Sequence, residues 1–347
     1  MKYEDRTYHL TMRDVAKAAG VSIATVSRAL RHNKTVNPGT ANHVLEIANK
    51  LNYYPNFQAK SLRLKRTNSI GIIFNNLGNP FFTEILSEIT MVLNKTDYFM
   101  IVCDSNYSIE SERKNIISMI SKGVDGIIIS PIDPGGENIK LLLNNQIETV
   151  FIDCLPYFSD QCYVYTDQKQ GIRLSIEYLV KNGHKNILLF TCPQEKNMTD
   201  LFKSTYLELS HKYGFKIERE FFIESDEFTI DSGYKVFKKL LTQDISDKNV
   251  GFTSIATMND LLAIGIYKAA NELGIDIPGN YSILGYDDIE ITSVLKPPLT
   301  TVHQSRKRIG IESVTKLLHN INSQEKDREN VVFRPYIVVR GSVRSIH

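Results

Sequence analysis

Cysteine is scarce in this sequence. The 347 residues include only four, which form no C-x-x-C pair and have no histidine at metal-ligand spacing: Cys103, Cys154, Cys162 and Cys192. This pattern argues against a disulfide framework or a metal site and favours reduced, buried thiols. No apolar run approaches the ~20 residues that cross a bilayer, and the opening MKYEDRTYHL lacks an apolar secretory core. We therefore expect a cytoplasmic protein with no membrane partner.

Catalytic motifs are also absent. The sequence contains no G-x-G-x-x-G, no Walker A pattern, no H-E-x-x-H and no G-x-S-x-G. His184, in NGHKNI, suits a structural turn, and His303 has no evident carboxylate partner along the chain. These absences predict a protein that is not an enzyme and that needs neither a metal nor a cofactor.

Positive charge is concentrated at the N-terminus. Residues 1–66 hold 12 lysines and arginines against 4 acidic residues, whereas the rest of the chain holds 29 against 35. A basic head on an acidic body indicates a polyanionic partner for the head. A solvated basic tail is the simpler alternative, but this segment also carries helix caps and apolar periodicity, which a tail does not need.

Two short helices are predicted within residues 15–30, VAKAAGVSIATVSRAL. The first spans about 13–19 and ends at Gly20, since a glycine after a helix readily adopts positive φ. Ser22 can cap the second helix by accepting a bond from the amide of residue 24 or 25. Neither helix is long enough to be stable alone, so a packing partner is needed.

A third helix over 37–51 supplies that partner and completes a helix-turn-helix unit. The second helix would then present its N-terminus and one face to the solvent, in a form that suits the major groove of DNA. An αα-hairpin without a nucleic-acid role is the alternative, and the charge of the head favours DNA. The residues on this exposed face are Ile23, Ala24, Thr25, Ser27 and Arg28.

The segment 53–67, YYPNFQAKSLRLKRT, links the head to the rest of the chain. Asn56 can cap a short helix whose lysines and arginines suit a DNA backbone. Leu62 is the kind of apolar side chain that can enter a minor-groove step. From the residues alone, an ordinary basic linker with an incidental leucine is the favoured interpretation.

The body, from Asn68 onward, alternates short apolar strands with amphipathic helices, which predicts parallel sheets covered on both faces. The expected strands are 70–74, 99–103, 126–129, 150–153, 187–190, 254–256 and 282–285. The expected helices are 81–93, 110–121, 170–182, 232–241 and 260–273. So many units favour two doubly wound α/β halves, with a boundary near residue 160, behind an all-α head.

Polar and aromatic residues gather where these strands end. Ligands of such sheets bind at the carboxyl ends of the strands, so two facing halves would enclose a cleft for a small polar ligand. Each residue also has a structural alternative, since Phe81 and Phe82 suit a core and Asn79 suits a helix cap. The set includes Asn75, Asn79, Phe81, Phe82, Asp104, Ser105, Asn106, Asp153, Asn259, Asp260, Asp287 and Asp288.

Taken together, these motifs resemble the LacI family of bacterial transcription regulators, over nearly the whole chain. TMRDVAKAAGVSIATVSRAL is similar to the family's helix-turn-helix and YYPNFQAKSLR to its hinge. NLGNPFF, ATMNDLLAIG, ILGYDDIEITSVLKPPLTTVHQ and RGSV are similar to its sensor body. The resemblance implies a homodimer on a near-palindromic operator. It also implies a body like the type I periplasmic binding proteins, with a small-molecule effector such as a sugar or a sugar derivative between its halves.

The resemblance also implies a division of the chain and three crossings between the halves. The helix-turn-helix domain would span 1–55 and the hinge 56–67. The first half would comprise 68–160 with about 293–325, and the second 161–292 with about 326–347. The last crossing would place a helix over 305–320 on the first half and a strand over 331–339 on the second.

Residue roles follow from the same match. Ile23, Ala24 and Arg28 would read bases, and Leu62 would insert at the operator centre, contrary to its interpretation above. Phosphate or hinge positions would be Ser22, Ser27, Asn37, Thr40, Tyr53, Asn56 and Ala59. Effector positions would be Phe81, Phe82, Asp153, Phe228, Asn259 and Asp287.

One departure concerns the effector. The family commonly carries an arginine in the region TCPQEKNMTDLFKSTY, but this chain has none between Arg173 and Arg219, and Phe202 takes its place. Lysine is only a point donor, so Lys196 is an imperfect substitute. The alternatives left open are a more apolar effector, a protein co-regulator, a binding protein without sugar specificity, or a sugar-acting enzyme.

Overall fold

The structure is a computed structural model, and it describes residues 10–30, 35–54, 66–193, 196–215, 222–244 and 251–346, the side chains of 196, 243 and 244 excepted. The chain divides into two compact units, residues 1–67 and residues 68–347, which are described separately below as the head and the body.

The head contains three helices, α1 (Met12–Ala19), α2 (Ile23–Ala29) and α3 (Pro38–Lys50). Gly20 follows α1 with φ 65°, and the Ser22 side chain accepts a hydrogen bond from the Thr25 amide at 3.1 Å. The Asn37 side chain likewise accepts from the Gly39 amide at 2.9 Å. The helix end predicted at Gly20 and the caps predicted at Ser22 and Asn37 are therefore present.

Small and β-branched side chains hold the three helices together. Val15, Val26 and Val44 are completely buried where the helices meet, and Ala16 and Ala19 allow α1 to approach its neighbours. The two short helices gain from this packing the stability that their length denies them.

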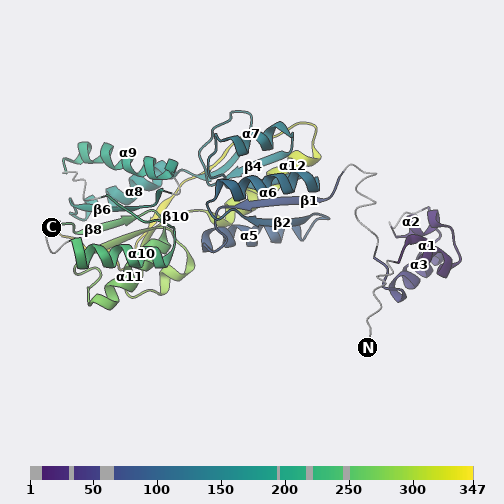
Figure 1. The fold of residues 1–347 in the computed structure, drawn as a ribbon, viewed down its shortest axis with the longest axis horizontal. Coiled ribbons are helices and arrows are strands. Elements are labelled where there is room, and N and C mark those ends of the chain that lie inside the picture. The colour runs from purple at the N-terminus through teal and green to yellow at the C-terminus, as the bar shows by residue number, and fades with distance from the viewer. Residues whose placement is uncertain are drawn as a thin grey trace. The chain divides into compact units, whose positions relative to one another are not determined.

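The body contains two six-stranded sheets flanked by helices (Figure 1). The first half comprises β1 (Ser69–Phe74), α5 (Pro80–Leu93), β2 (Phe99–Asp104), α6 (Ile109–Lys122), β3 (Gly126–Ile129), α7 (Glu137–Asn144), β4 (Glu148–Ile152), β5 (Cys162–Thr166), α12 (Arg306–Asn322) and β11 (Val331–Phe333). Its strand order is β11-β5-β4-β3-β1-β2, parallel throughout.

The second half is built in the same way. It comprises α8 (Gln168–Lys181), β6 (Ile187–Thr191), α9 (Lys196–Tyr213), β7 (Phe222–Glu224), α10 (Ile230–Lys239) with a π-turn at Leu240–Asp244, β8 (Ser254–Thr257), α11 (Asp260–Leu273), β9 (Ser282–Asp287), a 3-10 turn at Glu290–Val294, β10 (Thr300–His303) and β12 (Tyr336–Val338). The strand order is β12-β10-β9-β8-β6-β7, with β12 antiparallel to β10.

Apolar strands lie at the centre of both sheets, as the sequence predicts. Every residue of β1, β3, β6, β8 and β9 is buried, because helices cover both faces of a doubly wound sheet. The edge strand β2 is instead partly exposed. The predicted fold class is therefore confirmed.

The predicted limits of the halves need correction. The boundary expected near 160 falls later, because β5 (Cys162–Thr166) pairs with β4 of the first sheet. The residues 293–303 were assigned to the first half, but β10 pairs with β9 of the second sheet. The expected strand 331–339 is two strands, since β11 pairs with β5 in the first sheet and β12 with β10 in the second.

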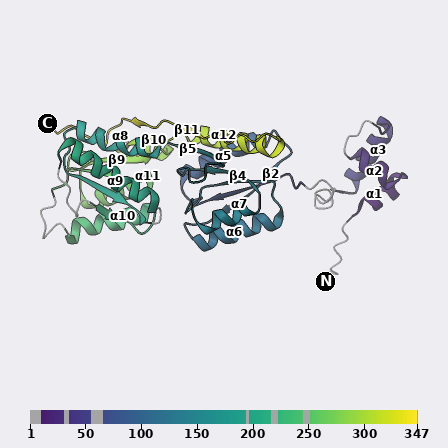
Figure 2. The same cartoon turned by 90° about the horizontal axis from the view of Figure 1, so that it is seen from above.

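In the described part of the chain, three short crossings join the halves. Asp167 alone separates β5 from α8, residues 304–305 separate β10 from α12, and residues 334–335 separate β11 from β12. As expected, α12 belongs to the first half, where it packs against α5 (Figure 2). Among the described helices, none is long and apolar enough to cross a membrane.

Candidate functional site

The α2 helix presents most of its predicted face to the solvent. Ile23 is 45% exposed although it is a large apolar residue, and Ser22, Ala24 and Arg28 are also exposed. Thr25 and Ser27 are half-buried, and Val26 is completely buried behind them. An exposed isoleucine does little for the fold, so its place at the start of a short helix is better suited to contact with another molecule.

The remaining predicted DNA positions differ in their placement. Asn37 is exposed and Thr40 is half-buried at the start of α3. Tyr53 is only 8% exposed and packs in the core of the head, so its main contact is with the head itself. Asn56, Ala59 and Leu62 lie outside the described residues.

A pocket lies between the two halves of the body, and it is called the inner pocket below. It spans about 380 Å³, its open side included. Six predicted effector positions line it: Phe81, Phe82, Asp153, Phe228, Asn259 and Asp287. The side chain of Lys196, the seventh, lies outside the described residues. Asn79, Tyr107, Gln168, Met198, Met258, Tyr286 and Gln304 also line the inner pocket, and only Asn79 among them had been singled out from the sequence.

Aromatic rings form much of its wall. Phe81 meets Phe82 edge-on, with ring centroids 5.1 Å apart, and Phe82 stacks on Phe74 behind it. The ring centroids of Tyr107, in the first half, and Phe228, in the second, are 5.3 Å apart, so the two halves are in contact beside the pocket. Offset and edge-on rings of this kind leave flat faces for an apolar or ring-shaped ligand.

Phe202 does not replace the family's arginine in the pocket. Its ring is buried in the core of the second half and meets the ring of Tyr286 edge-on at 6.0 Å. Tyr286, not Phe202, faces the inner pocket. Phe202 therefore supports a pocket residue from behind.

The carboxylates of the pocket sit on unusual backbone at the ends of strands. Asp153 follows β4 with φ 53°, and Asp287 ends β9 with φ 118°. Positive φ at a residue other than glycine costs free energy and is found mostly where function requires a particular side-chain direction. Nε2 of Gln304 donates to Oδ1 of Asp287 at 2.8 Å, and Nε2 of Gln168 lies 3.4 Å from Oδ1 of Asp153.

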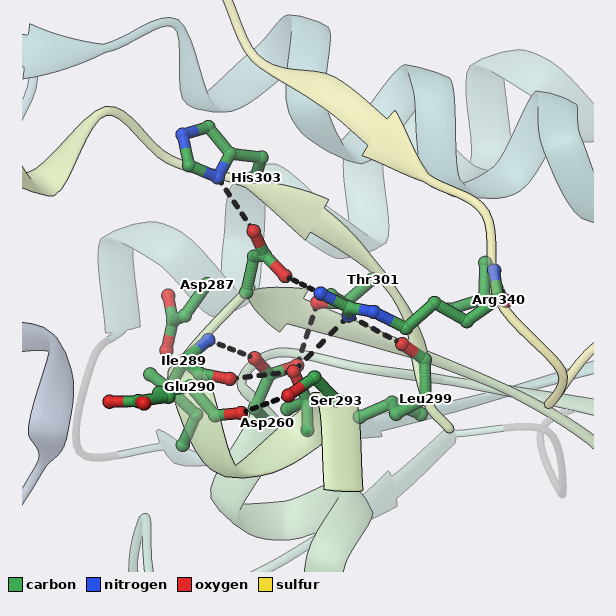
Figure 3. A network of polar contacts seen from close by, with 12 residues as sticks. Asp260, Asp287, Ile289, Glu290, Ser293, Leu299, Thr301, His303 and Arg340 are labelled. Carbon is green, nitrogen blue, oxygen red and sulfur yellow. Dashed lines mark hydrogen bonds and ion pairs between the residues drawn. The ribbon is translucent and has the colours of Figure 1, made fainter. Parts of the chain in front are cut away.

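Burial raises the pKa of Asp287 well above its ordinary value, and the negative charges of Asp260 and Asp153 add to this effect. Burial also raises the pKa of Asp260, which accepts hydrogen bonds from the Thr301 hydroxyl at 2.7 Å and the Ile289 amide at 2.9 Å. Figure 3 shows Asp260 with its bonds to Ile289 and Thr301, and Asp287 nearby. Two neighbouring carboxyl groups thus resist ionisation together.

The surroundings of Asp288 favour its ionised form, in contrast to those of Asp260 and Asp287. Its oxygens lie 2.7 Å from Nδ1 of His303 and 2.6 Å from a guanidinium nitrogen of Arg340 (Figure 3). These bonds lower its pKa despite its burial. The carboxylate partner of His303, invisible along the chain, is therefore supplied by the fold. His184 is buried between Thr253 and the carbonyl of Arg344, in the structural role expected.

Arg306 connects the loop of Asp287 to the first half. Its guanidinium donates to the carbonyl oxygens of Asp287 and Asp288, and its Nε donates to the Glu84 carboxylate at 2.9 Å. Glu84 belongs to α5, so one side chain at the start of α12 joins the pocket loop of the second half to a helix of the first.

Comparison with known proteins agrees with this geometry. Residues 11–56 match the model of bacterial regulatory proteins of the lacI family, and residues 176–343 match a periplasmic binding protein-like domain. The HTH-type transcriptional repressor PurR of Pasteurella multocida is 31% identical over 336 residues, which cover 96% of this chain and 99% of the relative. The chain belongs to the LacI family.

Other LacI-family proteins extend the comparison. The ribose operon repressor of Escherichia coli K12 is 27% identical over 96% of this chain and 99% of its own length. A regulator from Enterococcus faecium, solved with bound ribose, is 26% identical, with a TM-score of 0.71, and covers 80% of this chain and 100% of its own. The lac repressor dimer bound to operator and the anti-inducer ONPF shares the fold, with 24% identity, a TM-score of 0.82, and coverage of 96% and 99%.

Membership of the LacI family establishes the functional class of this protein. This LacI-family chain is a DNA-binding transcriptional repressor with a helix-turn-helix head and a periplasmic-binding-protein-like body. Its relatives are repressors rather than enzymes, which confirms the prediction drawn from the missing catalytic motifs.

Proposed function

We propose that the protein is a homodimeric repressor of the cytoplasm that binds a near-palindromic operator and is controlled by a small sugar between the halves of its body. The inner pocket carries this proposal, because six predicted effector positions line one space between the two sheets. A ribose operon repressor and a ribose-bound regulator among its relatives favour a pentose or a related sugar.

On DNA, α2 would enter the major groove. Ile23, Ala24 and Arg28 would contact bases, and Ser22, Thr25, Ser27, Asn37 and Thr40 would hold the backbone nearby. In the hinge, Tyr53, Asn56 and Ala59 would position Leu62 to enter the minor groove at the operator centre. Two heads of a dimer would then read two half-sites one helical turn or more apart.

In the pocket, polar side chains would recognise hydroxyl groups. Asp153 and Asp287 would accept hydrogen bonds, while the amide of Asn259, whose oxygen caps α11 through the Leu262 amide at 2.9 Å, would donate its own N–H groups. Phe81, Phe82 and Phe228 would cover the faces of the sugar ring, and Lys196 is proposed as a further contact on the family match alone. A sugar changes operator affinity only if it binds the two arrangements of the body unequally.

A band-shift titration tests the proposal. The operator is first selected in vitro from random duplexes, and the full-length protein is then titrated against it and against a scrambled duplex, with and without a panel of sugars. We expect preference for the selected duplex and a shift of the midpoint with at least one sugar. Equal affinity for both duplexes would refute sequence-specific DNA binding. A midpoint that no sugar changes would refute control by a sugar.

A further inference from the structure

The crossings between the two halves of the body are in contact with one another. The backbone amide of Asp167, which forms the first crossing, donates to the carbonyl oxygen of Phe333 at 2.8 Å, and Phe333 is the last residue before the third crossing. The guanidinium of Arg308, in the first turn of α12 just after the second crossing, lies over the ring of Phe333, 4.6 Å from its centroid. One residue of β11 therefore contacts the first crossing and the start of the helix that follows the second.

His303 makes the corresponding contact in the second half. It ends β10 directly before the second crossing, and Tyr336 begins β12 directly after the third. The two rings stack, with centroids 4.5 Å apart and planes inclined by 27°. Tyr336 is 53% exposed, so the stack gives a defined place to a ring that is not buried in a core. The second and third crossings are thus joined by ring contacts at both of their ends.

The same imidazole also reaches the loop that carries Asp287. Nδ1 of His303 lies 2.7 Å from Oδ2 of Asp288, whose other oxygen accepts a bond from Arg340 at 2.6 Å (Figure 3). The side chains of His303 and Asp288 are 23% and 13% exposed, so solvent screens their interaction only partly. His303 therefore contacts this loop on one side and the residue that follows the third crossing on the other.

The backbone of this loop depends on such contacts. Asp287 and Asp288 both have positive φ, 118° and 59°, a conformation that costs free energy at residues other than glycine. Strained residues keep their conformation when surrounding contacts hold them. Arg306 binds both carbonyl oxygens, and His303 and Arg340 bind the Asp288 carboxylate. A movement of Asp287 should therefore also disturb the bond between Asp288 and His303.

We propose, building on the sugar-controlled function above, that His303 is a positioning residue that couples the Asp287 loop to the second and third crossings. A ligand that shifts the loop shifts the imidazole, and the imidazole shifts Tyr336 and the start of β12. His303 does not line the inner pocket, so it acts through Asp288 and Tyr336 and not by contact with the ligand. Without His303, a sugar would still bind but would change operator affinity less.

Band-shift titration of the full-length protein on the selected operator tests this coupling. The Kd for the operator is measured without sugar and with saturating D-ribose, and D-xylose is the second probe. The ratio of the two values measures transmission and does not depend on how tightly the sugar binds. We expect His303→Ala to bring this ratio closer to one by a factor of about three or more. A lower melting temperature with an unchanged ratio would show a merely structural role and refute the proposal.

Further variants separate the two contacts. His303→Gln keeps a donor for Asp288 but loses the ring, and His303→Phe keeps the ring but loses the donor, so each should reduce the ratio in part. Tyr336→Leu should reduce it about twofold or more in the natural protein and less than about 1.5-fold in His303→Gln. Equal reductions in both backgrounds would refute coupling through the stack. His211→Gln and Tyr213→Leu, at exposed positions of α9, are the controls and should leave the ratio unchanged.

Hydrogen exchange of the full-length protein without sugar tests the same connection independently. In His303→Ala, the loop amide of Ile289 and the amides of β12 should both exchange about threefold faster or more than in the natural protein. Faster exchange at only one of these places, or at neither, would refute the coupling. If no sugar changes operator affinity, the sugar-controlled function fails, and the exchange measurement alone decides the role of His303.

Discussion

At the scale of single residues, exposure distinguishes side chains that stabilise the fold from those available to a partner. In α2, Val26 is completely buried and Ile23 is 45% exposed, although both are β-branched and apolar. Only the first contributes its full transfer free energy to the folded head. The second is free to contribute to an interface.

Replacement of Ile23 by alanine should therefore separate folding from recognition. We expect Ile23→Ala to change the free energy of unfolding by less than about 0.5 kcal/mol and to weaken binding to the selected operator by roughly 5- to 100-fold. Binding to scrambled DNA should barely change. Thermal unfolding and band-shift titration measure the two effects, and Val26→Ala, which should destabilise the head, is the comparison. Equal losses on both duplexes would refute base contact by Ile23.

The pair of Asp260 and Asp287 predicts a pH dependence of stability. Burial raises the pKa of Asp260 from 3.8 to about 7, so between these values the folded protein binds more protons than the unfolded chain. Stability from this group is consequently lost as the pH rises through that window. Asparagine cannot ionise. The free energy of unfolding of Asp260→Asn should therefore rise by roughly 1–4 kcal/mol relative to that of the natural protein as the pH goes from about 4 to about 8.

Urea unfolding at several pH values measures this difference. Asp97→Asn, at an exposed position of the first half, is the matched control and should give curves parallel to those of the natural protein. Parallel curves for Asp260→Asn as well would show that the buried carboxyl group does not titrate in this range.

At the scale of helices and strands, local signals predict the elements that carry their own caps and apolar stripes. Gly20, Ser22 and Asn37 mark the helices of the head correctly, and α11 (Asp260–Leu273) has its predicted limits. The strands β5 and β10 were missed because each has only five or four residues, although their tyrosines, valines and threonines favour strands. Pairing with neighbours distant in sequence stabilises them, and no local pattern reports that.

The missed strands explain the missed pocket residues. Gln168 lies just beyond the end of β5 and Gln304 just beyond the end of β10, so neither was recognised as a strand-end residue. Asp153, Asn259 and Asp287 follow strands that were predicted, and they line the pocket as expected. The helix α9 was also missed, although the spacing of Phe202, Tyr206 and Leu209 has a helical period that could have revealed it.

The turn of the head offers a test at this scale. Gly20 has φ 65° and no atom lies within 4 Å of the place where a β-carbon would be, so Gly20→Ala should cost only backbone strain, about 1 kcal/mol. Asn52 has φ 49° after α3, and Asn52→Gly relieves such strain and should not destabilise the head. Hydrogen exchange of α1–α3 in the full-length protein measures both. Unchanged exchange in Gly20→Ala would contradict the need for glycine.

At the scale of the whole molecule, α12 and Arg306 connect the halves of the body. The side chains of Arg306 and Glu84 are 8% and 28% exposed, so their ion pair is screened less than a surface pair. The same guanidinium bonds the carbonyl oxygens of Asp287 and Asp288, so the ion pair lies next to the loop that carries Asp287. The resemblance to a known family predicted that α12 belongs to the first half, but the Arg306–Glu84 contact required the folded coordinates.

Loss of this ion pair should make the body easier to rearrange. We expect Glu84→Gln to change the sugar concentration at the midpoint of the operator response by at least threefold. Arg306→Gln should have a larger effect, because it also removes the bonds to the Asp287 and Asp288 carbonyl oxygens, and Glu84→Gln should add little once Arg306 is changed. Glu110→Gln is the control, because Glu110 pairs with Lys114 on α6 with both side chains more than 70% exposed. Additive effects of Glu84→Gln and Arg306→Gln would show that the two residues act separately.

The three crossings described above contain only one or two residues each, and two of them border the inner pocket through Gln168 and Gln304. Crossings this short restrict sliding of the halves and favour rotation about an axis that passes beside the inner pocket. A ligand in the inner pocket would lie close to this axis, so small movements there would accompany larger movements far from the axis. A small rotation about this axis is thus magnified at the far end of each half, which in the first half carries the start of β1 at Ser69.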